Sequence, residues 1–84
     1  MDFINITQRK AAQRVARLSP RQYQTLYLLM TGYSFKQTAV MMKISYQTIA
    51  AHIFVARRKL GAANLAQAAA IMMISGMVKV KDEK

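Results

Sequence analysis

A start signal for a helix occurs twice in this chain of 84 residues and constrains its fold more than any other feature. Ser19 is followed by Pro20 and then by Gln22, which is the order of an N-cap, a first helical position and the third residue of a capping box. Ser34 and Gln37 repeat this spacing. In a capping box, the hydroxyl and the side-chain amide each bond a backbone N–H at the helix start. The sequence therefore predicts that helices begin after Ser19 and Ser34.

Caps, glycines and apolar spacing give the extents of four helices. The first lies between Ser19 and Gly32, and the second lies between Ser34 and a break at Lys43 and Ile44. The third covers 45–60 and ends at Gly61, and the fourth covers 64–75 and ends at Gly76. The third has an inward stripe at steps of three and four, formed by Ile49, Ile53, Ala56 and Leu60. No stretch alternates apolar and polar residues as a half-buried strand does, so we expect an all-α fold.

A further helix is predicted over 7–18, ahead of these four. Four basic residues at steps of four, three and four would form a stripe: Lys10, Arg14, Arg17 and Arg21. Pro20 breaks the helix before Arg21. The other side is apolar, with Ala11, Val15 and Leu18. Three interpretations of the stripe stay open: a solvated face, an arm that follows phosphates, and an amphipathic helix for a membrane surface or a calmodulin-like partner.

The acidic residues lie only at the two ends of the chain. Lysine and arginine number 13 against 3 Asp and Glu, which gives a formal net charge of +10, and the acids are Asp2, Asp82 and Glu83. Positions 3–81 thus offer no carboxylate for an acid–base pair, a hard cation or a catalytic triad. One His and no Cys exclude zinc, iron–sulfur and thiol chemistry. We expect a polyanion-binding protein that is not an enzyme and needs no cofactor or metal.

No apolar run in the chain has the length of a membrane span. The most apolar stretch, Leu65–Val78, contains Gln67, Ser75 and Gly76 and falls short of the roughly 20 residues that a spanning helix requires. No signal-peptide pattern opens the chain. We therefore expect a soluble, cytoplasmic protein that has no membrane partner.

The second and third predicted helices have the proportions of a helix-turn-helix. In that motif a short helix and a tight turn lead to a longer helix that lies in the major groove of DNA. Because the inward stripe packs in the core, the opposite face of this helix is the one that would meet base edges. It consists of Gln47, Ala50, Ala51, Phe54 and Arg58. Gln can pair with adenine through two hydrogen bonds, whereas Ala and Phe offer only apolar contact, for example with thymine methyls. This face therefore has few groups that can read bases.

A basic cluster of Arg57, Arg58 and Lys59 ends the same helix. These side chains can reach phosphates, and they also suit the negative end of the helix macrodipole. Both roles stay open, and we expect at least one of the three to contact phosphate.

An ordered set of fragments extends from Leu18 to Val78. It consists of Leu18-Ser19-Pro20-Arg21, Gly32 to Ala39, Ile44 to His52, Lys59-Leu60-Gly61, Asn64 and Gly76-Met77-Val78. In this order and spacing, the fragments resemble the LuxR/GerE type of helix-turn-helix domain from bacterial transcription regulators. The resemblance covers about the whole of such a domain and is specific because the complete set matches.

The resemblance implies roles for individual residues. In that family the third helix is the recognition helix, and the fourth commonly forms a dimer contact. Lys36, Thr48 and His52 are implied to touch the DNA backbone. The predicted DNA-binding set is then Lys36, Tyr46, Gln47, Thr48, Ala50, Ala51, His52, Phe54, Arg57, Arg58 and Lys59. The predicted dimer contact comprises Leu65, Ala68, Ala69, Met72 and Met73.

Four positions depart from the family pattern. Gln22 and Gln37 stand where the family usually has Glu, which keeps the capping hydrogen bonds and removes negative charge. Ala50 replaces a commonly basic residue, and Phe54 is unusually apolar for a face that enters the groove. We expect strong backbone binding combined with limited readout of bases.

The expected organisation is a basic N-terminal arm or helix over 1–17, a LuxR-type domain over 18–78 and a charged flexible tail over 79–84. Larger family members carry a sensor domain ahead of the helix-turn-helix, and we expect none here. The expected function is a sequence-preferring transcription regulator that binds double-stranded DNA as a homodimer and lies with the nucleoid. A hetero-complex with another regulator or with RNA polymerase also stays open. Two other classes remain: a small interaction protein that pairs with another regulator and modulates it, and a cationic protein that binds a membrane surface through Lys10, Arg14 and Arg17.

Overall fold

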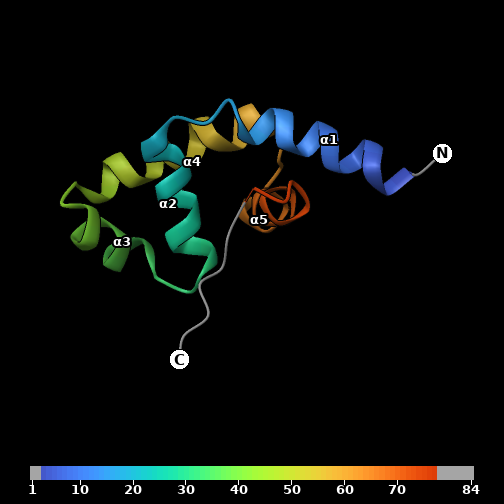
Figure 1. The fold of residues 1–84 in the computed structure, drawn as a ribbon. Helices are drawn as coiled ribbons and strands as arrows, with labels where there is room; N and C mark the ends of the chain where they lie inside the picture. The colour runs from blue at the N-terminus through green and yellow to red at the C-terminus, as the bar shows by residue number, and fades with distance from the viewer. Residues whose placement is uncertain (1–2, 78–84) are drawn as a thin grey trace.

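The computed structural model describes residues 3–77, with the side chains of 7–77, and contains five helices in that range. They are α1 (Phe3–Val15), α2 (Pro20–Met30), α3 (Phe35–Met42), α4 (Tyr46–Leu60) and α5 (Leu65–Ile74), as shown in Figure 1. No strand occurs between residues 3 and 77, which confirms the all-α prediction. Val78 and the predicted tail over 79–84 lie outside the described residues.

Both predicted capping boxes are present. The Oγ of Ser19 accepts a hydrogen bond from the backbone N–H of Gln22 at 3.1 Å, and the backbone N–H of Ser19 donates to Gln22 Oε1 at 3.0 Å. Ser34 and Gln37 make the equivalent pair at 3.0 and 2.9 Å. A neutral amide therefore closes each box without adding a negative charge to the helix start.

The turn between α3 and α4 depends on a lysine in a left-handed conformation. Lys43 has φ 59° and ψ 42°, and it is the only residue other than glycine with positive φ in the described part of the chain. Ser45 then caps α4, because its Oγ accepts from the backbone N–H of Thr48 at 3.0 Å. The two helices meet at a bend of 104°. This is the abrupt change of direction that a helix-turn-helix requires.

The hydrophobic core is built around α4. The predicted inward stripe of α4 is confirmed, since Ile49, Ala56 and Leu60 have no exposed surface and Ile53 is 6% exposed. The buried residues that pack with this stripe come from the other four helices and the loop before α5: Val15, Leu26, Ala39, Met42, Ala62, Ala68 and Met72. Because one side of α4 is fully used by the core, the opposite side is the one available for binding.

The N-terminal helix begins and ends earlier in the chain than the predicted range of 7–18. It runs over Phe3–Val15, and the hydrogen bonds from Arg17 to Arg14 and from Leu18 to Val15 are i→i−3 bonds of a closing turn. Ser19 must be extended to cap α2, and the residue before a proline disfavours the helical conformation, so the helix ends early. Ala11 and Val15 are buried as predicted, and Leu18 packs on the core from the turn.

α1 packs against α5 and against the C-terminal end of α4. In Figure 1 it extends outward from that end of α4 along one edge of the molecule, with α5 beneath it in this view. The N-terminal segment is therefore an integral fifth helix of the fold.

Within residues 3–77, no single helix combines the length and apolar content of a membrane span; α3 and α4 meet those criteria only when they are taken together as a bent pair.

Candidate nucleic-acid interface

The outward face of α4 is open to solvent. The five side chains predicted to meet base edges are all exposed: Gln47, Ala50, Ala51, Phe54 and Arg58. Phe54 is 57% exposed, an unusual position for a large apolar side chain on a helix whose other side is fully packed. The carbon at the centre of the Arg58 guanidinium lies 5.7 Å from the centroid of the Phe54 ring. This cation–π contact holds the arginine on the same face.

The N-terminal ends of α3 and α4 are tied together by two aromatic rings. Tyr46 is 55% exposed, and its ring packs on that of Phe35 with centroids 5.6 Å apart and planes tilted by 35°. The residue predicted to contact DNA at the start of α4 thus also fixes that helix start against α3. One side of Tyr46 remains free to face a ligand.

The three side chains implied to touch the backbone of DNA are accessible. Thr48 and His52 are half-buried on α4, one turn apart, and Lys36 is exposed in the first turn of α3. The hydroxyls of Ser45 and Thr48 lie 2.9 Å apart, so Thr48 is held at the helix start by the capping residue. The arrangement presents a hydroxyl, an imidazole and an amine beside the outward face of α4.

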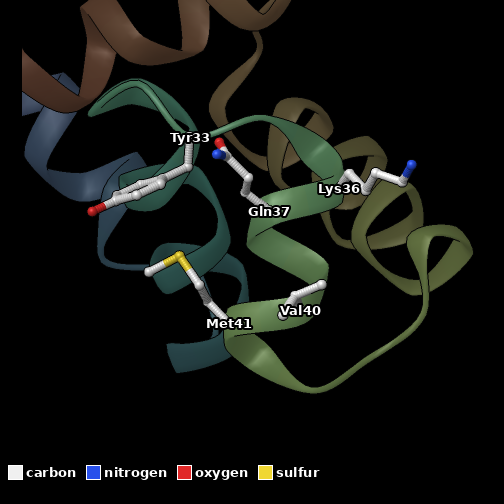
Figure 2. Close-up of a pocket in the computed structure, with 5 residues that line it drawn as sticks. All are labelled: Tyr33, Lys36, Gln37, Val40 and Met41. Atoms are coloured by element: carbon white, nitrogen blue, oxygen red, sulfur yellow. The ribbon is translucent and has the colours of Figure 1, made fainter.

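A shallow hollow of about 400 Å³ lies beside Lys36, and Figure 2 shows its lining. The lining consists of Tyr33, Lys36, Gln37, Val40 and Met41. The Lys36 amine points away from Tyr33 and Met41, toward the outside of α3 (Figure 2). Gln37 already bonds Ser34 in the capping box, so the hollow is mainly apolar and leaves the Lys36 amine free of it.

Two members of the basic cluster at the end of α4 have partners inside the protein. The Nη2 of Arg57 donates to the carbonyl oxygen of Ala63 at 2.6 Å. The Nζ of Lys59 donates to the carbonyl oxygen of Arg17 at 3.1 Å and to Gln22 Oε1 at 2.9 Å. Arg58 makes no such bond and is the most open of the three, on the outward face. These internal contacts were not visible in the sequence, because their partners lie up to 42 residues away.

Positive charge on this surface is not neutralised within the described residues. Positions 3–77 contain no Asp or Glu, so no lysine or arginine in this range has an acidic neighbour there. Long-range attraction to a polyanion is therefore undiminished by internal ion pairs.

A family comparison agrees with this geometry. The family model described as "Bacterial regulatory proteins, luxR family" matches residues 16–72. The chain belongs to this family. It therefore carries a DNA-binding helix-turn-helix domain of the LuxR type, as the resemblance implied, and DNA is the partner of such a domain. No curated protein and no solved structure shows a significant match to the chain.

In this LuxR-type domain, α5 cannot use all five residues predicted for a dimer contact. Ala68 and Met72 have no exposed surface and belong to the domain's own core, so the predicted dimer contact is limited to the other three. Leu65 and Ala69 are half-buried, and only Met73 is well exposed, at 54%. The prediction also missed two exposed apolar side chains that follow Met73 in the sequence. Ile74 is 44% exposed and Met77 is 43% exposed. Helical spacing gave no signal for them, because adjacent helical residues point about 100° apart and α5 ends before Met77.

Proposed function

We propose that the protein is a sequence-preferring transcription regulator that places α4 in the major groove of duplex DNA. The observation that carries this proposal is the division of α4 into a buried stripe and a fully exposed face. A helix of about 10–12 Å diameter with side chains fits a major groove of about 12 Å. With no acid between residues 3 and 77, the docked face meets the phosphates without local repulsion.

Base readout on this proposal is concentrated in few residues. Gln47 lies in the first turn of α4 and offers a donor and an acceptor to the edge of adenine. Ala50, Ala51 and Phe54 supply apolar contact, and Tyr46 flanks them at the helix start. Arg58 is the second group on this face able to hydrogen-bond a base or a phosphate.

Backbone contact is assigned to Lys36, Thr48 and His52. A hydroxyl, an imidazole N–H and an ammonium group all donate to phosphate oxygens. Arg57 and Lys59, which the prediction included in the DNA-binding set, use part of their donor capacity on Ala63, Arg17 and Gln22. Their main contribution on this proposal is to hold the end of α4 in place, with Arg58 as the free phosphate donor of the cluster.

Dimerisation is proposed through the exposed part of α5. Met73, Ile74 and Met77 are large, apolar, exposed and close in the sequence, and Leu65 and Ala69 are half-buried on the same helix. A two-fold dimer would present two α4 helices to two half-sites. On this proposal the protein acts in the cytoplasm, at the nucleoid, because bacterial DNA lies there.

The second candidate function is pairing with another regulator, or with RNA polymerase, through the same α5 surface. It is favoured by the exposure of three large apolar side chains on one helix and the turn after it. Size-exclusion chromatography with light scattering separates the two cases. A protein that is monomeric at micromolar concentration and pairs only with a second regulator supports this candidate, whereas a stable homodimer supports the first.

The primary test is a salt titration of duplex binding. The logarithm of the binding constant should fall linearly with the logarithm of salt concentration, with a slope of about −0.9 for each phosphate neutralised. A slope near zero, or no binding at low salt, would contradict the proposal. No acid–base pair or activated nucleophile occurs among the described side chains, so no enzymatic activity is proposed.

A further inference from the structure

Two crossing hydrogen bonds fix the end of α1 to the end of α4. The Nη1 of Arg14 donates to the carbonyl oxygen of Leu60, the last residue of α4, at 3.1 Å. In the opposite direction, the Nζ of Lys59 donates to the carbonyl oxygen of Arg17 just after α1, at 3.1 Å. The two helices therefore keep a defined relationship, and α1 is an extension of the α4 end rather than a loose arm.

Lys10 and Arg14 lie close together around α1, and Arg17 follows in the turn after the helix. At 3.6 residues per turn, Arg14 points about 40° from Lys10 around the helix. Helical spacing extended to Arg17 would place it about 20° from Lys10 and about 60° from Arg14. Arg14 is the residue that reaches over the C-terminal end of α4. We call Lys10, Arg14 and Arg17 the α1 basic stripe. In Figure 1, α1 continues outward from the C-terminal end of α4, so the stripe begins where the groove-docked helix ends.

The stripe is exposed and has no internal counter-charge. All three side chains are exposed, and no hydrogen bond to another described residue is made by the amine of Lys10 or the guanidinium of Arg17. A solvated helix face in an ordinary protein mixes acids with bases at steps of three and four residues. α1 has no acid, and neither does any other part of 3–77. Three uncompensated cations on one face suit an anionic surface with regularly spaced charges.

We propose that the α1 basic stripe is a second phosphate-binding site, which contacts the DNA backbone that flanks the sequence docked by α4. This inference rests on the proposed function, because it takes α4 to lie in the major groove. The end of a helix docked in the groove lies near the bordering phosphates, and α1 starts from that end. The stripe covers positions 10–17, a span of roughly 10 Å along the helix axis, which equals about three steps along one strand of DNA.

The test compares single substitutions that each remove one positive charge. Lys10→Gln and Arg17→Gln remove the free members of the stripe, and Arg9→Gln is the matched control. Arg9 is exposed on the same helix but points about 100° away from Lys10. Arg14 is left intact because it bonds Leu60. Helix content measured by circular dichroism should be unchanged in all three variants, since none of the replaced side chains has a partner in the fold.

Binding is measured as a function of salt on two duplexes, one limited to the selected site and one with about ten further base pairs on each side. On the longer duplex, each stripe variant should reduce the magnitude of the salt slope by about 0.9, and Arg9→Gln should change it much less. The wild type should bind the longer duplex several-fold more tightly than the shorter one, and the double variant of Lys10 and Arg17 should lose this preference.

Two results would overturn the inference while leaving the proposed function standing. One is that the wild type binds the selected site with a steep salt slope, but the stripe variants behave like Arg9→Gln and flanking DNA adds nothing. The other is that the stripe variants lose binding to vesicles of phosphatidylglycerol and phosphatidylcholine while their DNA binding is unchanged, which would assign the stripe to a membrane surface. Absence of any DNA binding by the wild type would instead remove the proposed function itself.

Discussion

The Nζ of Lys59 lies 2.9 Å from Oε1 of Gln22, and the same oxygen accepts a hydrogen bond from the backbone N–H of Ser19. One amide oxygen thus closes the capping box of α2 and holds the C-terminal end of α4. The contact is part-buried and joins positions 37 residues apart. Replacement of this amide by a carboxylate would turn a hydrogen bond between a cation and a neutral group into an ion pair.

We therefore expect Gln22→Glu to stabilise the fold more than Gln37→Glu. Both substitutions place a negative charge near a helix N-terminus, which favours each helix by about 0.3–1 kcal/mol. Only Gln22 lies beside a lysine, and this additional pair contributes about 0.5–1 kcal/mol. Urea unfolding of the two variants measures the difference. Equal stabilities would show that the Lys59 contact contributes nothing to the fold.

The end of α4 should be sensitive to a side chain at Gly61. This residue has φ 71°, and a Cβ built there would lie 3.0 Å from Nη1 of Arg14. Gly61→Ala should lower the free energy of unfolding by about 1–2 kcal/mol, because a left-handed alanine is strained. Gly61→Asn should lower it less, since Asn tolerates that conformation. Thermal unfolding that ranks the asparagine variant below the alanine variant would contradict this account of the turn.

Substitution of two neighbouring methionines on α5 should affect different properties of the protein. Met72 is fully buried, and Met72→Ala should cost about 2–5 kcal/mol of stability through lost packing and a cavity. Met73 is 54% exposed, so Met73→Ala should change the stability of the monomer by at most about 0.5 kcal/mol. The same change should weaken a homodimer, which analytical ultracentrifugation detects. A Met73→Ala protein that dimerises as well as the wild type would move the interface away from this surface.

Thr48 and His52 should contribute affinity without sequence preference. Loss of one hydrogen bond to a charged phosphate costs about 1.5–3 kcal/mol, so Thr48→Ala and His52→Ala should each weaken binding by roughly ten- to a hundredfold on every duplex tested. Gln24→Ala is the control, since Gln24 is exposed on α2 and has no predicted contact with DNA. Fluorescence anisotropy with specific and unrelated duplexes measures the effect. A loss confined to one sequence would show that these residues read bases instead.

Local signals in the sequence were sufficient for most of the helical fold. Hydroxyl caps at Ser19, Ser34 and Ser45 and the stops at Lys43 and Gly61 located three helices, because each signal acts within four residues of its own helix end. The inward stripe of α4 followed from periodicity alone. The outward face was therefore identified as the remainder of that helix.

What the sequence could not show depends on contacts between distant residues. The docking of α1 on α5 and on the end of α4 buries Ala11 and Val15, but an apolar side on a helix does not say which partner covers it. Met72 and Met73 are adjacent and chemically identical, and only the packing of α5 separates the buried one from the exposed one. The bond from Lys59 to Arg17 has no local signal at either residue.

If α4 reads a preferred sequence in the major groove, selection of bound duplexes from a random pool should recover that sequence. For the wild type, we predict an enriched site with two related halves about 34–36 Å apart, one helical turn of DNA, or a multiple of that distance. Selection with Gln47→Ala should lose preference at one position of each half-site and keep the others. No enriched sequence for the wild type, or an identical site for the Gln47→Ala variant, would contradict the account.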